Sequence, residues 1–381
     1  MIRDSIPGEE LLHKAHAIGQ YYGFTPLVLL ASKTRNAMHA KADNQNTFPD
    51  TGNDQVAEII LSFLKQCRNI EFAPSQRRPF FIWHTNIAPG RPAQKKTILQ
   101  FHALGTDRAI ADSVVIRALL ALSRDIFREE PIVRINSMGD KETRARYARE
   151  LGIFFKKRAS VLSEECLMYA KNDVFRAAEH IIANECTDDL PAPTEHLSDA
   201  SRKRFEDLLE YLEMTETPYE LARHLISRGN IWSDICFEIM AGGQRVAWGS
   251  RYGDLTRHFF PSSSFPAIGA VLQITGEGPI VKKIPATRLR FSFVHIGDEA
   301  KRLSIHLAED FRKARIPLTQ HIGIESLTEQ LYIAERQNNP YLLIMGRKEA
   351  LENTAILRNR ATQEETILPL TGLIERLKAF A

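Results

Sequence analysis

Basic side chains in the last ninety or so residues are of a type that suits one definite chemistry. Arginine and lysine pair with phosphate oxygens, and arginine can do so through two parallel hydrogen bonds. The candidates for phosphate contact are Arg312, Lys313, Arg315, Arg347, Lys348, Arg358 and Arg360. A solvated helical face would carry the same charges, so the sequence leaves both interpretations open.

General-purpose catalytic motifs are absent from the sequence. It contains no phosphate-binding GxxxxGK[ST], no HExxH and no GxSxG. The four cysteines, Cys67, Cys166, Cys186 and Cys236, are far apart and lack the spacing of a zinc site. We therefore expect reduced structural thiols, no bound metal, and mostly structural roles for the twelve scattered histidines.

Length and composition predict a folded protein of two domains. A chain of 381 residues exceeds the usual size of a single core, and 44% hydrophobic with 25% charged residues is the globular average. No apolar run is long enough to cross a membrane and the first residues lack a secretory signal, which predicts a cytoplasmic location. A formal net charge of +3 is too small to attract nucleic acid in bulk, so any such contact needs local patches.

Periodicity in the first 150 residues predicts alternating helices and strands. A helix at 11–22 ends at Gly23, two strands flank a connection at 88–96, and a helix follows at 109–127. A short strand at 132–135 leads into Asn136, Ser137 and Gly139, which are typical turn residues. The polar stretch at 32–53 is predicted to be a long loop.

The second half changes its pattern near 282–290. Before that point we predict partly helical residues at 161–197, a helix around Phe205 and Leu212, and two strands joined by Gly242 and Gly243. The run at 266–275 fits a strand or a buried helix. After it, short apolar runs alternate with amphipathic helices, which predicts a small α/β domain with a mainly parallel sheet.

An ordered series of segments resembles the histidyl-tRNA synthetase family along nearly the whole chain. The segments are INSMGDKETRARY (135–147), ISRGNIWSDICFEIM (226–240), WGSRYGDL (248–255) and PAIGAVLQI (266–274). They are similar to the family's "NSLG", "VRGLDYYTRTVFE", "GGRYDGL" and motif 3 segments. LAEDFRKARIPL and LLIMGRKEALENT resemble the anticodon-binding domain of the histidine, glycine, threonine and proline enzymes.

The resemblance implies an α+β architecture. We expect an antiparallel, six-or-so-stranded class II sheet with flanking helices in residues 1–285, with a helical insertion near 150–200. An anticodon-binding-like α/β domain is expected in residues 290–381. The family also implies a homodimer and contact with tRNA, although motif 1, which builds the dimer interface, is represented only by YYGFTPL with its proline displaced to Pro26.

The positions of the two family arginines that hold phosphate charge during ATP-dependent activation are changed. IAPGRPAQKKTILQFHALGTD (87–107) aligns with motif 2 and places its catalytic arginine on Ala88, while the motif 3 arginine falls on Gly276. Arg91 is a candidate for a displaced substitute. Because losing one such contact costs about 10²–10³ in rate, losing both disfavours efficient adenylation.

The amino-acid pocket implied by the resemblance is also altered. The family's "LRPEGT" remains only as TFPDTG, the substrate-reading glutamine becomes Ala103, and the tyrosine pair becomes Trp232 and Ser233. The retained positions that we take as pocket remnants are Asp50, His102, Asp107, Trp232, Glu238, Arg251 and Tyr252.

Arg228 is the second catalytic candidate beside Arg91. Its alternative role is a structural ion pair with an acid such as Glu238. For Arg251 and Tyr252, which stand where a strand turns, we expect structural support.

Three functional interpretations follow from the resemblance. The first is a non-catalytic paralogue that binds tRNA or a protein partner and needs no cofactor. The second is an active, divergent histidine–tRNA ligase that uses ATP and Mg²⁺. The third is a regulatory subunit related to that of ATP phosphoribosyltransferase, which is disfavoured because that family usually lacks the anticodon-binding domain.

Overall fold

The computed structural model describes residues 8–28, 54–70, 74–76, 78–87, 96–184, 189–227, 231–275 and 289–380. Its larger sheet has the strand order β1-β2-β3-β8-β7-β6-β4-β5. Six central strands pair antiparallel: β2 Phe80–Ile87, β3 Lys96–Leu104, β8 Ala267–Thr275, β7 Gln244–Arg251, β6 Ser233–Ala241 and β4 Ile132–Gly139. This confirms the predicted antiparallel sheet. Two short parallel edge strands, β1 Thr25–Pro26 and β5 Tyr219–Leu221, extend it.

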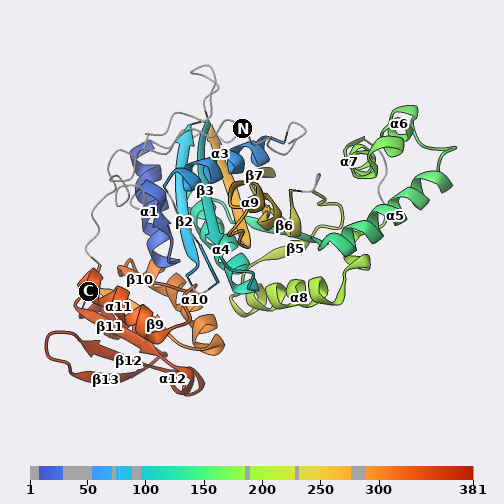
Figure 1. Ribbon diagram of the computed structural model, residues 1–381. Helices are drawn as coiled ribbons and strands as arrows, with labels where there is room; N and C mark the ends of the chain where they lie inside the picture. Colours follow the sequence, from blue (N-terminus) through green and yellow to red (C-terminus); the bar gives the residue numbers. More distant parts are fainter. Residues whose placement is uncertain are drawn as a thin grey trace.

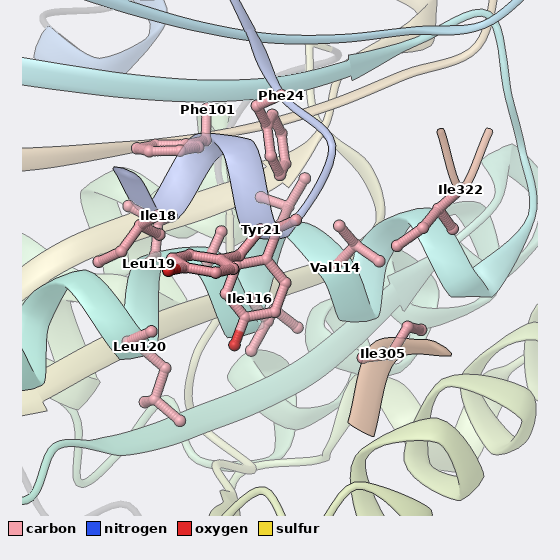
Figure 2. Packing of buried hydrophobic residues seen from close by; sticks show 14 of the residues in the cluster. Ile18, Tyr21, Phe24, Phe101, Val114, Ile116, Leu119, Leu120, Ile305 and Ile322 are labelled. Carbon is pink, nitrogen blue, oxygen red and sulfur yellow. The ribbon is translucent and has the colours of Figure 1, made fainter. Parts of the chain in front are cut away.

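One face of this sheet is covered by three helices, α1 Gly8–Tyr21, α4 Ala109–Phe127 and α8 Asp199–Met214. Helix α4 has the predicted bounds and is buried along almost its whole circumference, including polar positions such as Asp112 and Arg117. Phe24 packs edge-on against Phe101 of β3, with ring centroids 5.0 Å apart. Figure 2 shows these rings with side chains of α1 and α4 in one cluster.

The opposite face carries α3 Gln55–Asn69 and α9 Gly253–Phe259. Beside it, α5 Lys141–Lys157, α6 Glu164–Asn172 and α7 Val174–Asn184 form a helical arm that projects away from the sheet (Figure 1). The arm has its own small core, which includes Tyr147, Phe155 and Ala178. A short 3-10 helix, η3 Pro193–His196, leads back into α8.

The C-terminal domain contains a second sheet in the order β10-β9-β11-β12-β13. Its strands are β9 Phe291–His295, β10 Leu318–Gln320, β11 Tyr341–Met345, β12 Thr354–Asn359 and β13 Glu365–Pro369. Its helices are α10 Asp298–Lys313, α11 Leu327–Gln337, α12 Arg347–Leu351 and α13 Leu373–Lys378.

The expectation of a mainly parallel second sheet is wrong for one strand, β12, which runs opposite to the other four. Strand β9 pairs parallel with β10 and β11, whereas β12 pairs antiparallel with both β11 and β13. The connections on either side of β12 are short, and a parallel crossover needs a dozen or more residues. Because β8 ends at Thr275 and residues 276–288 lie outside the described residues, the domain boundary at 285–290 stays a prediction.

The predicted turn after residue 135 is a continuation of β4. Asn136 and Ser137 are buried and pair with Cys236 and Ile235 of β6. The Asn136 side chain donates to the carbonyl oxygens of Arg223 and Leu225, so burial in the strand leaves its amide satisfied. Of these three predicted turn residues, only Gly139 has a left-handed backbone. The predicted hairpin at Gly242 and Gly243 is confirmed, with both glycines at positive φ.

A buried charge network joins the two domains. Glu309 of α10 accepts a hydrogen bond of 2.8 Å from the Tyr22 hydroxyl at the end of α1 and pairs with Arg312 at 2.7 Å. Arg312 also contacts Asp125 of α4 at 3.1 Å. Because Glu309 is only 8% exposed, its charge depends on these partners. The Arg312 and Tyr22 hydrogen bonds outweigh burial and lower the pKa of Glu309 to about 2.

Apolar contacts and backbone contacts accompany this network. Ile305 and Ile322 of the C-terminal domain belong to the same hydrophobic cluster as α1 and α4, as Figure 2 shows. The Gln320 side chain donates to the carbonyl oxygen of Tyr21 at 2.7 Å. A Cβ at Gly23 would lie 2.7 Å from the Gln320 carbonyl oxygen, so this close approach needs glycine. We conclude that the domains dock closely.

In the described part of the chain, no helix is both long enough and apolar enough to cross a bilayer. The three cysteines within it, Cys67, Cys166 and Cys236, are buried free thiols, as expected.

Replacing Glu309 with glutamine should destabilise the protein by roughly 2–3 kcal/mol at pH 7, since it removes the charge that Arg312 faces. The ordinary pKa of 4.5 falls to about 2 in the folded state. This stabilisation is therefore fully present above the unfolded pKa and is lost as the pH falls through the folded pKa. Thermal melts of both proteins should differ less near pH 3 than at pH 7. Glu299→Gln, on the exposed part of α10, is the matched control; a pH-independent difference would contradict the network.

Candidate functional site

Several predicted site residues lie outside the described residues. These are both catalytic candidates, Arg91 and Arg228, the pocket residue Asp50, and the changed arginine positions Ala88 and Gly276. Their roles stay predictions. The remaining candidates can be located, and the structure divides them between the two faces of the large sheet.

His102 lies on the α3 face, fully buried. Its ring stacks on Phe63 of α3, with centroids 3.7 Å apart and planes inclined by 7°. The Tyr252 hydroxyl is 2.8 Å from Nδ1, and Gln100 Oε1 is 3.2 Å from Nε2. Gln100 in turn donates to Asn86 Oδ1 at 3.1 Å. The four side chains form one continuous hydrogen-bonded chain that runs from β2 through β3 to Tyr252, at the N-cap of α9.

The protonation of this chain follows from its burial. Desolvation, followed by the neighbouring His84, holds the pKa of His102 well below its usual value, while burial raises the pKa of Tyr252 well above its own. The neutral imidazole must therefore accept the Tyr252 proton at Nδ1 and donate from Nε2 to Gln100. Every ring nitrogen then has a partner within the protein.

Gly269 of β8 makes room for this arrangement. It pairs directly with His102 in the sheet, so both positions face α3. A Cβ at Gly269 would lie 2.1 Å from the His102 Nδ1 atom. Ala103, aligned with the family's substrate-reading glutamine, instead points into the core beneath α1 and α4. Strand alternation thus separates the two neighbouring positions by the thickness of the sheet.

Trp232 also belongs to the α3 face and is 1% exposed. Its indole Nε1 donates to Asp54 Oδ2 at 2.9 Å, and its ring packs edge-on against Trp248 with centroids 4.7 Å apart. Asp54 is the N-cap of α3, where its other oxygen accepts from the backbone of Val56 and Ala57. The indole therefore anchors the helix that covers this face.

Glu238 of β6 forms an ion pair with Arg134 of β4 at 2.7 Å and lies 3.8 Å from Arg245 of β7. These pairs link neighbouring strands across the sheet. The proposed pairing with Arg228 lies outside the described residues.

Arg251 and Asp107 lie away from these groups. Arg251 is buried with Asp112 of α4, 2.7 Å away, and donates to the carbonyl oxygens of Thr106 and Arg108. Burial raises the pKa of Asp112 to about 6, although the Arg251 charge opposes the rise. These contacts tie the end of β7 to α4 and to the β3–α4 connection. Asp107 is exposed between β3 and α4.

A groove of about 1150 Å³ lies between the helical arm and the sheet. Of the predicted pocket residues that the structure describes, Trp232 and Ser233 line it. Its other walls come from the start of α5, from Phe175, from α9 and from residues 264–266. Lys141 and Asp254 face each other across the groove at 3.7 Å.

Sequence reasoning missed the charged residues of this groove. Arg144 of α5 donates to the Trp232 carbonyl oxygen at 3.0 Å and lies 5.1 Å from the Phe175 ring centroid. Asp140 caps α5 and accepts from Thr143 and Ser198. Although burial tends to raise the pKa of Asp140, these hydrogen bonds lower it. The only sequence signal was the Asp-x-x-Thr start of α5.

The groove mixes both charge signs with aromatic rings. Asp254 and Arg257 of α9 are paired at 3.3 Å, and Asp234 pairs with Arg204 at 2.6 Å. No group of three or more potential metal ligands occurs among the described residues.

The predicted phosphate-binding cations do not form a uniform group. Lys313, Arg315, Arg347 and Lys348 are exposed, whereas Arg358 pairs with Glu365 at 2.6 Å. Arg360 donates to the Asn339 and Glu335 carbonyl oxygens. Arg312 belongs to the interdomain network, so its guanidinium already has partners. Phosphate contact by the exposed residues stays a prediction.

Comparison with known proteins places these features in context. A family model for the anticodon binding domain matches residues 291–380. The histidine–tRNA ligase of Clostridioides difficile (strain 630) is 24% identical over 367 residues, which cover 92% of this chain and 85% of that protein. That of Geobacillus sp. (strain WCH70) is 27% identical over 294 residues, covering 72% and 68%. The apo histidyl-tRNA synthetase of S. aureus has the same fold, with a TM-score of 0.50 and 19% identity over 99% of this chain and 98% of that one.

Replacing Tyr252 with phenylalanine should remove the hydrogen bond to His102 Nδ1 and destabilise the protein by about 1–2 kcal/mol in urea unfolding. In the unchanged protein, ¹⁵N NMR should find His102 neutral, with its proton on Nε2, throughout pH 5–8. Titration of His102 within that range, or a proton on Nδ1, would contradict the chain of hydrogen bonds. Tyr332→Phe, at an exposed tyrosine of α11, controls for loss of a hydroxyl.

Proposed function

Because the chain is a divergent member of the histidyl-tRNA synthetase family, we propose that it is a non-catalytic relative of the histidine–tRNA ligases that binds tRNA. The observation that carries the proposal is the hydrogen-bonded chain of Asn86, Gln100, His102 and Tyr252. These polar groups over the sheet are committed to one another, and the indole of Trp232 is committed to Asp54.

Polar side chains that already hydrogen-bond to one another bind a substrate poorly. A ligand that approached His102 would have to replace hydrogen bonds that are already made, and displacing a satisfied buried group gives little net free energy. The resemblance adds that the two family arginines fall on Ala88 and Gly276, neither of which can stabilise phosphate charge. Both considerations favour loss of adenylation.

The C-terminal domain supports the proposal of RNA contact. Arg347 and Lys348 begin α12 and are exposed, and Lys313 and Arg315 are exposed at the end of α10. Exposed cations of this kind neutralise phosphates with little desolvation cost. The proposal includes a homodimer and a cytoplasmic location. A protein partner is the alternative to tRNA.

An active ligase is the second candidate, and the groove beside Trp232 favours it. At about 1150 Å³ the groove exceeds the usual volume of a small-molecule site. The regulatory-subunit interpretation stays disfavoured, because the match to the anticodon binding domain supports a domain that those subunits usually lack.

Purified protein with ATP, Mg²⁺ and each amino acid in turn should give no ATP–pyrophosphate exchange above a protein-free blank. An authentic histidyl-tRNA synthetase in the same assay is the positive control. Histidine-dependent exchange would overturn the non-catalytic proposal, and Arg91→Ala would then identify whether that residue replaces the lost arginine.

Binding of tRNA should weaken about tenfold when Arg347 and Lys348 are both replaced by alanine, and the dependence of log K on log salt should become shallower by about two. Filter binding between 50 and 200 mM salt measures both quantities. The double variant Arg202→Ala/Lys203→Ala removes two exposed cations from α8 and should bind as the parent does. Equal weakening by both double variants would count against a specific role for α12.

A further inference from the structure

A second, smaller cavity lies at the junction of the two domains. It measures about 90 Å³ and lies between α4, the turn after α8, and α10. Its floor is made by buried side chains, namely Tyr22, Arg117, Thr215, Thr217 and Glu309. Its rim carries more exposed ones, namely Arg124, Glu216, His306, Asp310 and Lys313.

Arg117 is the unusual group on this floor. It is 7% exposed, and its Nη1 donates to the Thr215 carbonyl oxygen and the Thr217 hydroxyl, both at 2.7 Å. Its buried Nε has no hydrogen-bond partner, and no carboxylate in the described part of the chain forms an ion pair with it. A buried guanidinium ordinarily has a paired anion, because desolvation of an unpaired charge is costly.

Two of the three carboxylates around the cavity, Glu309 and Asp310, have other partners, and the third, Glu216, is exposed on the rim. Glu309 is shared by Tyr22, Arg312 and Arg124, the last at 3.6 Å. Asp310 lies 3.9 Å from the His306 ring on the rim. Arg117 therefore interacts with Glu309 through charge alone, without an ion-pair contact. Lys313 adds an exposed positive charge at the opening of the cavity.

We propose that this cavity binds a phosphate-class oxyanion, held by Arg117 on the floor and Lys313 on the rim. A guanidinium edge with a free Nε is suited to two oxygens of such an anion. A cavity of about 90 Å³ holds a handful of water-sized atoms, which is the size class of a phosphate group. The same chemistry is offered by inorganic phosphate and by the terminal phosphate of a nucleotide.

Binding here would link the two domains. Tyr22 and Arg117 belong to the N-terminal domain, whereas Glu309 and Lys313 belong to α10 of the C-terminal domain. An anion that contacts both sides stabilises the docked arrangement over any separated one by mass action. Occupancy should therefore raise the melting temperature as well as release heat.

The test is calorimetric titration of the full-length protein with inorganic phosphate, in a phosphate-free buffer of constant ionic strength set with chloride. Parallel titrations with adenosine 5′-monophosphate and with adenosine distinguish a free phosphate from a nucleotide phosphate. We expect saturable phosphate binding that weakens at least tenfold in Arg117→Gln and at least threefold in Lys313→Ala. Arg202→Ala, at an exposed arginine of α8, should bind as the parent does.

Arg117→Gln loses contacts that hold the turn after α8, so its folding is checked by circular dichroism. Lys313→Glu provides a second variant, at the exposed rim of the cavity. Abolished binding in folded Lys313→Glu supports the site even if Arg117→Gln does not fold. Absence of saturable binding to the unchanged protein overturns the proposal and leaves water as the occupant. Unaltered affinity in both Lys313 variants also overturns it.

Discussion

The buried ion pair between Asp112 of α4 and Arg251 of β7 is the interaction on which the arrangement of the molecule depends. It fixes the central helix to the middle of the large sheet, and Arg251 ties the β3–α4 connection to the same point through two carbonyl oxygens. Helix α4 then packs against α1, α8 and the C-terminal domain at once. The position of α4 on the sheet therefore also sets where the C-terminal domain packs.

Around this anchor, the two faces of the sheet have different roles. The face beneath α1 and α4 forms an apolar core that continues into the C-terminal domain, as Figure 2 shows. The α3 face carries polar side chains, of which Asn86, Gln100, His102 and Tyr252 are satisfied by one another. His84, which packs against Phe63 on the same face, keeps a buried Nε2 without a partner. A scaffold that resembles an enzyme thus retains polar residues near the expected pocket, but uses them to hold its own strands and helices together.

Much of the fold could be predicted from the sequence where one local pattern dominates. The apolar run of α4 gave its bounds, and Gly242 with Gly243 identified the β6–β7 hairpin, because only glycine readily adopts positive φ at both positions. The antiparallel placement of β12 was missed, since its sequence TAILRN is compatible with either direction and only the short connections decide it. Asn136 and Ser137 look like turn residues until the carbonyl groups that satisfy them are known.

The candidate site was less predictable because it depends on contacts between distant residues. The alignment of His102 and Ala103 does not reveal that strand alternation sends one toward α3 and the other into the core. Arg312 looked like a surface cation, and its pairing with Glu309 and Asp125 becomes visible only once the domains dock. Arg117 gave no signal at all, since an arginine among the apolar residues of a helix predicts neither a cavity nor an unpartnered Nε.

The most direct test of the central claim is equilibrium binding of a stable histidyl-adenylate analogue, measured by calorimetry beside an authentic histidyl-tRNA synthetase. If the polar groups of the α3 face are committed to one another, the analogue should bind the control enzyme and give no saturable heat with this protein. Saturable binding with an affinity near that of the control enzyme would contradict the account, because it would require those groups to be available to a ligand.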